Sequence, residues 1–328
     1  MSRVIVTGGC GYIGSHVARA FKQNGDDVII IDRVKRDHTL KDIDGYYIGD
    51  FADDDSLATM VNYSPDIIVH CAGTSLVGPS MANPSEYYNN NVTKTIKMMD
   101  VVKNLDKKPT VMFSSSASVY GEPDVLPIKE DDDIHPMSPY GSTKLTDEMI
   151  LRDYSRAYGI DVCIFRYFNA AGAVPVTYDL GQEPEATHIV ARVLEASIAG
   201  RAFTINGDDF DTEDGTCIRD YVHVWDIAMA HVRAAGYFHR LGINVSVRVS
   251  IDLTLNLGTN QGTSNKEIVD YVREKYGLPF VNYGPRRPGD PAELVADAGQ
   301  ARELLGWEPV NSNIRNIIDS AYRWYTRS

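Results

Sequence analysis

The clearest signal of the fold is the stretch Arg3-Val4-Ile5-Val6-Thr7-Gly8-Gly9-Cys10-Gly11-Tyr12-Ile13-Gly14. Its first five residues are mostly β-branched or apolar, which predicts a strand buried on both faces. A glycine-rich turn follows, and then Ile13, Val17 and Phe21 recur at i, i+4 and i+8. That spacing predicts a helix with one apolar stripe. The stretch therefore indicates the first strand, turn and helix of a parallel α/β unit.

Two glycine patterns overlap in this turn, because Gly11 and Gly14 complete GxGxxG with Gly9 and GxxGxxG with Gly8. Glycines at this spacing let a dinucleotide diphosphate approach the backbone at the helix N-terminus. Asp32 ends the second predicted strand, where a carboxylate accepts hydrogen bonds from an adenosine ribose. An acid there favours NAD over NADP, although the arginine that follows it leaves NADP open. We therefore expect a dinucleotide site.

Further short apolar runs alternate with helical patterns through the first half of the chain. They lie at residues 28–31, 67–69, 110–113 and 162–165. After about residue 170, prolines and glycines break the chain into shorter pieces. We expect an α/β protein with a Rossmann-type doubly wound parallel sheet in residues 1–170 and a smaller α/β substrate-binding lobe made mainly by residues 171–328. A segment near 220–260 is expected to return to the first lobe, with a strand at 255–257.

Composition excludes several classes of protein. The chain has 328 residues, and 32 Lys and Arg against 45 Asp and Glu give a net charge of −13. So acidic a surface argues against binding nucleic acid or an anionic membrane, and no apolar run approaches the ~20 residues of a membrane span. The start of the chain does not resemble a signal peptide. The four cysteines lack disulfide-framework or metal spacing. We expect a cytoplasmic protein without a metal site.

A tyrosine and a lysine are candidates for acid–base chemistry. A Ser-Pro pair at 138–139 predicts the start of a helix, which places Tyr140 and Lys144 one turn apart on one face. A phenol has a pKa near 10, and a nearby ammonium together with a positive nicotinamide ring is expected to lower it. Such a pair also arises often by chance. The serines at 114–116 follow an apolar strand, where open α/β sheets place ligands, and one of them is suited to relay a proton.

Several motifs in order carry a resemblance to a known family. They are TGGCGYIGSH (7–16), YYNNNV (87–92), FSSSASVYG (113–121), SPYGSTK (138–144), RYFNAAGA (166–173), EDGTCIRDYVHVWDIAMAH (213–231), PRRPGDPAELVAD (285–297) and LGW (305–307). The chain resembles the extended short-chain dehydrogenase/reductases and, within them, the UDP-glucose 4-epimerases. The resemblance covers nearly the whole chain. It implies bound NAD, a UDP-sugar substrate, 4-epimerisation of a UDP-hexose through a transient 4-keto sugar, and a homodimer.

The resemblance also implies roles for single residues. The catalytic residues are Tyr140, Lys144 and Ser116, of which Ser116 and Tyr140 handle protons. The cofactor-binding residues are Gly8, Gly11, Tyr12, Ile13, Gly14, Asp32, Asp50, Phe51, Cys71, Ala72, Gly73, Asn91, Tyr140, Lys144 and Phe168. The substrate-binding residues are Ser116, Tyr140, Asn169, His188, Ile189, Arg219, Arg287 and Asp290. An arginine suits a diphosphate, because its guanidinium binds two oxygens at once.

Two positions separate the related chemistries. Ala117 and Ser118 precede Val-Tyr-Gly, where dehydratases of this family carry an acid pair and decarboxylases a glutamate. Elimination needs a general acid or base there, and none is present. Epimerisation therefore remains, with UDP-N-acetylhexosamine and UDP-pentose 4-epimerases as alternatives. Two alternatives belong to other functional classes. One is a non-catalytic NAD-binding sensor of nucleotide sugars, and the other is a net NADP-dependent reductase.

Three departures from the family pattern bear on the substrate. Ser75 stands where many members have lysine, and Asn206 stands where an aromatic usually meets the uracil. Leu294 stands where some members have tyrosine. A smaller side chain there leaves room for a 2-acetamido group.

Overall fold

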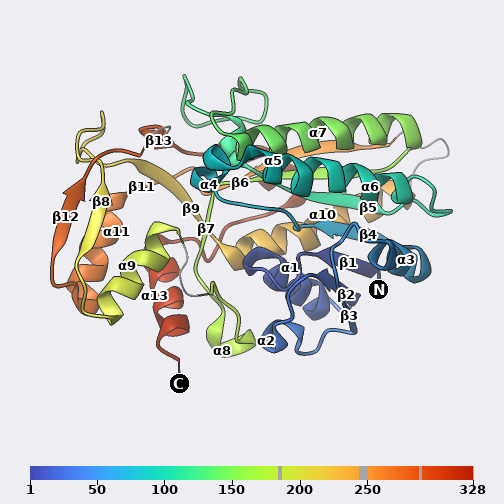
Figure 1. Ribbon diagram of the computed structural model, residues 1–328, viewed down its shortest axis with the longest axis horizontal. Helices are drawn as coiled ribbons and strands as arrows, with labels where there is room; N and C mark the ends of the chain where they lie inside the picture. Colours follow the sequence, from blue (N-terminus) through green and yellow to red (C-terminus); the bar gives the residue numbers. More distant parts are fainter. Residues whose placement is uncertain (184–186, 244–249, 288–289, 328) are drawn as a thin grey trace.

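The larger sheet has seven parallel strands. The computed structural model describes residues 1–183, 187–243, 250–287 and 290–327. The strands lie in the order β10-β6-β5-β4-β1-β2-β3 (Figure 1). Their bounds are β1 (Arg3–Thr7), β2 (Asp27–Asp32), β3 (Gly45–Ile48), β4 (Ile67–His70), β5 (Thr110–Ser116), β6 (Val162–Tyr167) and β10 (Asp252–Leu257). The predicted doubly wound parallel sheet is confirmed, and residues 255–257 lie in β10 beside β6.

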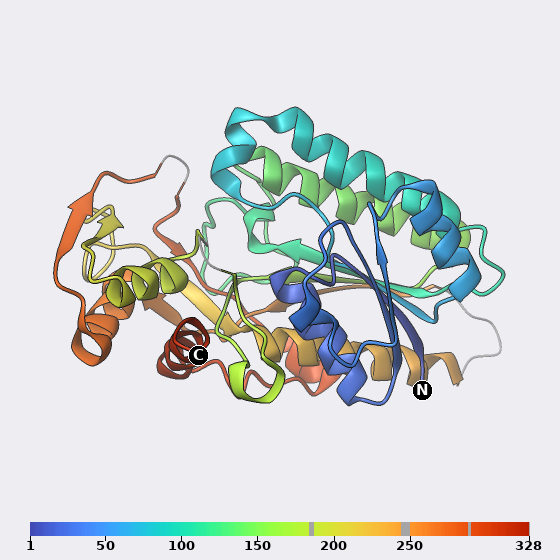
Figure 2. The same ribbon diagram turned by 60° about the horizontal axis from the view of Figure 1, so that its bottom comes forward.

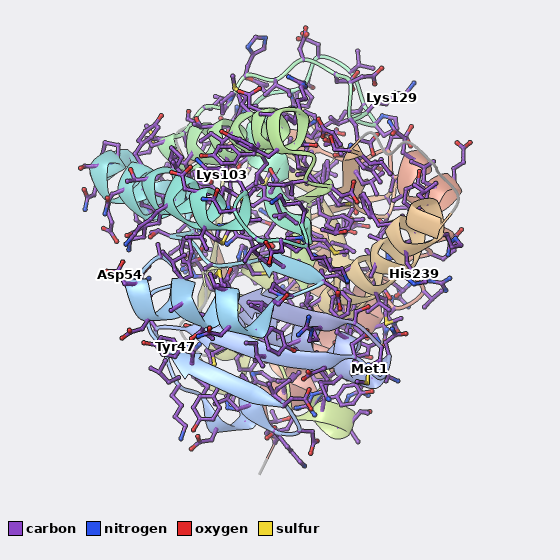
Figure 3. The ribbon with its side chains drawn as sticks, turned by 90° about the vertical axis from the view of Figure 1, so that its right-hand side faces the viewer. Met1, Tyr47, Asp54, Lys103, Lys129 and His239 are labelled. Carbon is purple, nitrogen blue, oxygen red and sulfur yellow. The ribbon has the colours of Figure 1, made fainter. Side chains whose placement is uncertain are left out.

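The strand β3 was not predicted. It is a short edge strand whose residues alternate between half-buried and exposed positions, so it lacks the apolar run of the inner strands. Figure 3 views the molecule from this side and shows Tyr47 of β3 near Asp54, where the next helix begins.

Helices cover both faces of this sheet (Figures 1 and 2). One face carries α1 (Tyr12–Gln23), α10 (Val224–Ile243) and α12 (Gly299–Leu305), whose apolar side chains share a core with β1, β2 and β6. The other carries α3 (Asp54–Tyr63), α6 (Lys94–Val102) and α7 (Pro139–Tyr158). Late segments therefore complete the layer that begins with α1.

A smaller region lies at the other end of the molecule (Figure 1). One small sheet joins β7 (Asn169–Ala171), β9 (Ile218–His223), β11 (Gly262–Ser264) and β13 (Glu293–Leu294), and another pairs β8 (Phe203–Asn206) with β12 (Val281–Gly284). The helices α9 (Ile189–Ile198), α11 (Asn265–Val272) and α13 (Ile314–Tyr325) pack there around a separate apolar core.

The remaining helical segments are short. They are α2 (Asp37–Leu40), α4 (Val77–Ala82), α5 (Pro84–Tyr87), α8 (Pro175–Tyr178), a 3₁₀ turn (Ala117–Val119) and two π-helical turns (Tyr88–Thr93 and Arg273–Gly277). Within the residues that the structure describes, no helix is long and apolar enough to cross a membrane.

The strand order fixes where a ligand can enter. The chain runs from β1 outward to β2 and β3, and then returns to the other side of β1 as β4. Open α/β sheets bind ligands at such a reversal, beyond the carboxyl ends of the strands. The glycine turn after β1 lies at this point, and a Cβ on Gly8 would lie 2.7 Å from the backbone nitrogen of Ala72 after β4.

Candidate active site

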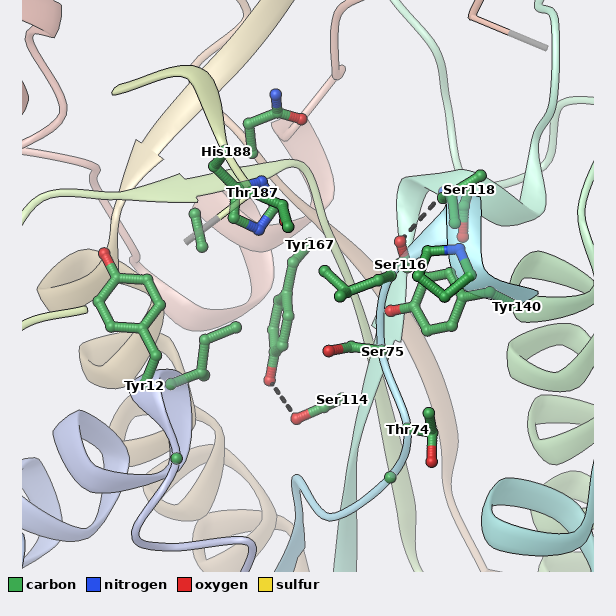
Figure 4. A pocket seen from close by; sticks show the side chains of 18 of the residues that line it. Tyr12, Thr74, Ser75, Ser114, Ser116, Ser118, Tyr140, Tyr167, Thr187 and His188 are labelled. Carbon is green, nitrogen blue, oxygen red and sulfur yellow. Dashed lines mark hydrogen bonds between the residues drawn. The ribbon is translucent and has the colours of Figure 1, made fainter. Parts of the chain in front are cut away.

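A cavity of about 1890 Å³ runs along the carboxyl ends of the strands. Its walls come from the turn after β1, the ends of β4 and β5, the start of α7 and parts of the smaller region (Figure 4). Of the residues that the resemblance assigns to catalysis or to binding cofactor or substrate, Asn91 and Ile189 do not line it, whereas all the others do. The structure thus brings residues from 8 to 290 to one cavity.

The glycine turn leaves open space at the N-terminus of α1. A Cβ on Gly14 would lie 2.3 Å from Gly8 O, and Gly8 itself has φ +69°. A side chain at either glycine would therefore clash with the backbone. The helix begins at Tyr12 with Gly11 as N-cap, and no side chain caps it. The first amides of α1 are thus available for an anion, which fits a diphosphate.

Carboxylates mark the far end of this part of the cavity. Asp32 ends β2 as predicted, and its carboxylate accepts hydrogen bonds from Cys10 N (2.9 Å) and Val34 N (3.0 Å). Asp50 pairs with Lys94 at 2.6 Å. Burial opposes ionisation of Asp50, but hydrogen bonds from Lys94 and the Ala52 amide, together with the charges of Lys94 and Arg33, outweigh it, so the pKa of this carboxyl is lowered. Both carboxyl groups are thus held in place at the cavity wall.

Asn91 lies one layer behind the cavity wall. Its buried side chain accepts from Thr74 N (2.7 Å) and donates to Thr74 O (3.1 Å) and Thr143 Oγ1 (2.9 Å). It thereby ties the loop after β4 to α7. Thr74 itself lines the cavity, so Asn91 shapes the wall without forming it. Ile189 is the first residue of α9 and lies behind His188 in the same way.

The start of α7 places the tyrosine and the lysine. Ser138 Oγ accepts from Gly141 N at 3.1 Å and Pro139 is the first helical residue, as predicted. Lys144 is 6% exposed, and its Nζ donates to Ser114 O at 2.9 Å. Lys144 Nζ lies 5.9 Å from the centre of the Tyr140 ring. Figure 4 shows the Tyr140 hydroxyl facing the same space as Ser116.

Burial dominates the titration of this pair. It raises the pKa of Tyr140, opposed by a hydrogen bond with Ser116. It also lowers the pKa of Lys144, opposed by the charges of Asp147, Cys71 and Glu148. The lowered pKa of Tyr140 was predicted from the ammonium together with a nicotinamide ring, and it stays a prediction for the protein with its cofactor bound. In the chain by itself desolvation of the phenol dominates, and the hydrogen bond of the ammonium goes to a carbonyl of β5.

Arg219 reaches the cavity from β9. It is 6% exposed, and it donates to Asp290 Oδ1 (3.0 Å) and to the carbonyl of Ile218 (2.8 Å). Its partner is thus Asp290 rather than the adjacent Asp220, which accepts hydrogen bonds from the loop after β10. Asn169, the first residue of β7, lines the same part of the cavity.

A second arginine lies beside a histidine in this part of the cavity. His188 is the N-cap residue of α9, and desolvation by the surrounding protein lowers its pKa, assisted by the charge of Arg287. With its amide oxygen turned toward Arg287, Asn206 accepts from Nε (2.9 Å) and Nη2 (3.0 Å). Pro288 and Gly289 lie outside the described residues. Asn206 therefore engages a guanidinium at the position where an aromatic was expected.

Sequence reasoning did not single out one prominent residue of the cavity. Tyr167, at the end of β6, is 6% exposed and lies beneath the centre of the cavity (Figure 4). Its hydroxyl lies 2.9 Å from Ser114 Oγ and 2.8 Å from His231 Nε2. The available signal was its place in RYFN, directly before Phe168. Thr187 and Gln182 were likewise missed, since they lie in a loop without a motif.

Comparison with known proteins defines the class and then the family. Residues 5–319 match the family model described as GDP-mannose 4,6 dehydratase, so the chain is an extended short-chain dehydrogenase/reductase. It is 40% identical to the UDP-glucose 4-epimerase of Halalkalibacterium halodurans, over 98% of this chain and 95% of the relative. The chain belongs to the UDP-glucose 4-epimerase family, whose members are isomerases.

Solved structures agree with this assignment. The UDP-glucose 4-epimerase of Brucella ovis in complex with NAD superposes with a TM-score of 0.90 and 38% identity, covering 98% of each chain. The UDP-Glc/GlcNAc 4-epimerase of Campylobacter jejuni superposes with a TM-score of 0.83 and 34% identity, covering 100% of each chain.

Proposed function

We propose that the chain interconverts UDP-galactose and UDP-glucose by NAD-dependent 4-epimerisation. One observation carries the proposal. Tyr140, Ser116 and Lys144 meet in the cavity between the open glycine turn and the arginines at 219 and 287. Acid–base groups thus stand between a place for a dinucleotide diphosphate and a place for a second diphosphate.

The part of the cavity at the glycine turn is assigned to NAD. The amides at Tyr12 and Ile13 would hold its diphosphate, Asp32 its ribose, Asp50 its adenine end and Phe168 its nicotinamide end. Support comes from the glycines of the turn, which line the cavity, and from the uncapped N-terminus of α1. When bound, NAD supplies a hydride acceptor and a positive ring charge near the phenol.

Tyr140 handles the proton of the reaction. As phenolate, its oxygen takes the proton of the sugar 4-hydroxyl, and the hydrogen bond with Ser116 stabilises the anionic form. Loss of this proton and of the C4 hydride leaves a 4-keto sugar. The ketone turns over, receives the hydride on its other face and recovers the proton from Tyr140. Ala117 and Ser118 offer no acid for eliminating water, so the sugar leaves intact.

The part of the cavity in the smaller region is assigned to the UDP-sugar. Arg219 and Arg287 would bind its diphosphate, and Asn169 and His188 would contact the sugar and nucleotide; all four line the cavity. Asp290 holds Arg219 by their 3.0 Å ion pair. Ile189 would act through His188, since it does not line the cavity.

A UDP-N-acetylhexosamine is the second candidate substrate. Leu294 lines the cavity and is half-buried, so its position is open to a 2-acetamido group. A relative of this chain is described as acting on both sugars. We expect measurable 4-epimerisation of UDP-N-acetylglucosamine by purified protein, followed by NMR. An active preparation that leaves this sugar unchanged would exclude it, and UDP-arabinose tests the pentose alternative.

Three further features belong to the proposal. The boundary of the NAD-binding lobe is placed near residue 170, with α10 and β10 returning to it. A homodimer is expected through α7, on which Met149 is 57% exposed. A cytoplasmic location suits the four cysteines, all of which are thiols. Light scattering tests the dimer.

The direct assay adds no cofactor. Purified protein is incubated with UDP-galactose, and UDP-glucose is then measured along with the NAD released on denaturation. We expect both. A sensor would release NAD and form no product, whereas a reductase would need NADPH from outside and consume it.

A further inference from the structure

A series of hydrogen-bonding side chains runs from the floor of the cavity into the core. Ser114 Oγ lies 2.9 Å from Tyr167 Oη, which lies 2.8 Å from His231 Nε2. Figure 4 shows the first of these contacts at the base of the cavity. His231 is 0%, Tyr167 6% and Ser114 8% exposed. Because water has so little access, each hydrogen in this series goes to one of these neighbours.

The protonation of His231 determines which atom donates in each of these hydrogen bonds. His231 Nδ1 lies 2.9 Å from the carbonyl oxygen of Ile227, which can only accept. Burial lowers the pKa of His231 to about 4, so the ring is neutral and carries one hydrogen. That hydrogen is on Nδ1, which leaves Nε2 as an acceptor. Tyr167 therefore donates to His231.

The direction passes on to Ser114. The single hydrogen of the Tyr167 hydroxyl goes to His231, so its oxygen accepts from Ser114. Ser114 Oγ also lies 3.0 Å from Cys71 Sγ, but a hydroxyl has one hydrogen to donate. His231 thus decides whether that hydrogen points to Tyr167 or to Cys71.

Ser114 is also the residue that holds the catalytic lysine. Its carbonyl accepts from Lys144 Nζ at 2.9 Å. Lys144 and Cys71 both line the cavity, on either side of this serine. Ser114 thus contacts Tyr167 through its side chain and Lys144 through its carbonyl.

We propose that His231 is a positioning residue for Lys144, because it orients Ser114 through Tyr167. The effect on turnover rests on the proposed function, whereas the effect on Cys71 does not. His231→Leu removes the acceptor. Tyr167 then donates to Ser114, and the hydrogen of Ser114 turns to Cys71, where it stabilises the thiolate.

The thiol of Cys71 reports this change without any catalysis. Burial raises its pKa to about 11, opposed in part by the contact with Ser114 and by the charge of Lys144, so the thiol reacts slowly with iodoacetamide. In the protein as purified, we expect iodoacetamide to alkylate Cys71 of the His231→Leu variant roughly tenfold faster than Cys71 of the wild type at a given pH. A hydrogen bond to the thiolate sulfur stabilises it and lowers the pKa of the thiol, by about one pH unit. Mass spectrometry identifies the modified residue. The conservative variant His231→Gln should react like the wild type, because its amide oxygen can accept from Tyr167.

Turnover and a second variant complete the test. We expect His231→Leu to lower kcat roughly fivefold with KM unchanged, and His231→Gln to restore it. Tyr167→Phe removes the oxygen that accepts from Ser114, so the Ser114 hydrogen turns to Cys71 in this variant as well. Cys71 of the double variant His231→Leu/Tyr167→Phe should therefore be alkylated no faster than Cys71 of either single variant. Folded His231→Leu or Tyr167→Phe protein with wild-type Cys71 reactivity, or additive effects, would overturn the inference. If the variants show this change in Cys71 reactivity but the wild-type protein has no epimerase activity, the proposed function is overturned instead.

Discussion

Burial controls the reactive residues of the cavity. Tyr140 and Lys144 lie at the predicted spacing, yet desolvation raises the pKa of Tyr140 and lowers that of Lys144, which favours the neutral form of each. The sequence could predict which residue types meet, because helix spacing is local. It could not predict their titration, because that depends on how β5 and the loop after β4 enclose them. Likewise, the partner of Arg219 is Asp290, far away in the sequence.

Replacing Tyr140 should remove the reaction while leaving the fold. We expect Tyr140→Phe to lower kcat at least roughly 100-fold, because general acid–base catalysis contributes that much or more. Conversion of UDP-galactose followed by NMR measures it. Tyr154→Phe on the same helix is the matched control, since its hydroxyl donates to Asp100 at 2.8 Å, outside the cavity lining. A Tyr140→Phe enzyme with wild-type turnover would refute the assignment.

Asp147 makes the stability of the fold depend on pH. It lies three residues after Lys144, is 1% exposed, and its Oδ1 has no hydrogen-bond partner among the described residues. Burial raises its pKa from 3.8 to about 7, opposed by Lys144. Between these values the unfolded chain releases a proton that the folded chain keeps. The contribution of Asp147 to the free energy of unfolding is thus fully present below pH 3.8. It falls as pH rises toward 7, by about 1.4 kcal/mol per pH unit.

Removing this carboxyl should remove that dependence. We expect Asp147→Asn to gain stability relative to the wild type, with a larger gain at pH 8 than at pH 5, in urea unfolding. Asp153→Asn on the same helix is the control, because that side chain is 75% exposed. An equal difference at both pH values would contradict the account.

Among the elements, α7 shows how local signals position the site. Its N-cap and first proline were predicted from Ser138 and Pro139, and both are confirmed. The inner strands were predicted as well, because their apolar runs are long. In the smaller region β7, β11 and β13 have only two or three residues each, too few to show a period. Their pairing comes from contacts distant in sequence.

The cap of α7 has a measurable share in stability. Ser138→Ala removes the acceptor for Gly141 N and should lower the free energy of unfolding by about 1 kcal/mol. Ser142→Ala, one turn further along the helix, is the control. Urea denaturation of the three proteins measures the difference, and an unchanged midpoint for Ser138→Ala would show that the cap contributes nothing.

In the molecule as a whole, the cavity lies between the seven-stranded sheet and the smaller region, and residues of both line it. The net charge of −13 did not exclude an anionic ligand, because Arg219 and Arg287 set a local field within the cavity. The fold and the glycine turn were predictable from local patterns. The meeting of residues from 8 to 290 was predictable only from the resemblance, since no local pattern spans that distance.

The most direct measurement follows the hydrogen at C4 of the sugar. UDP-galactose carrying deuterium at C4 is incubated with the purified protein, without added cofactor, and the product is examined by NMR. We predict UDP-glucose with the deuterium still at C4, now on the opposite face, because the hydride leaves and returns within one closed cavity. Deuterium found at C6 would indicate a dehydratase, and deuterium lost to solvent or to an external cofactor would contradict redox-neutral epimerisation.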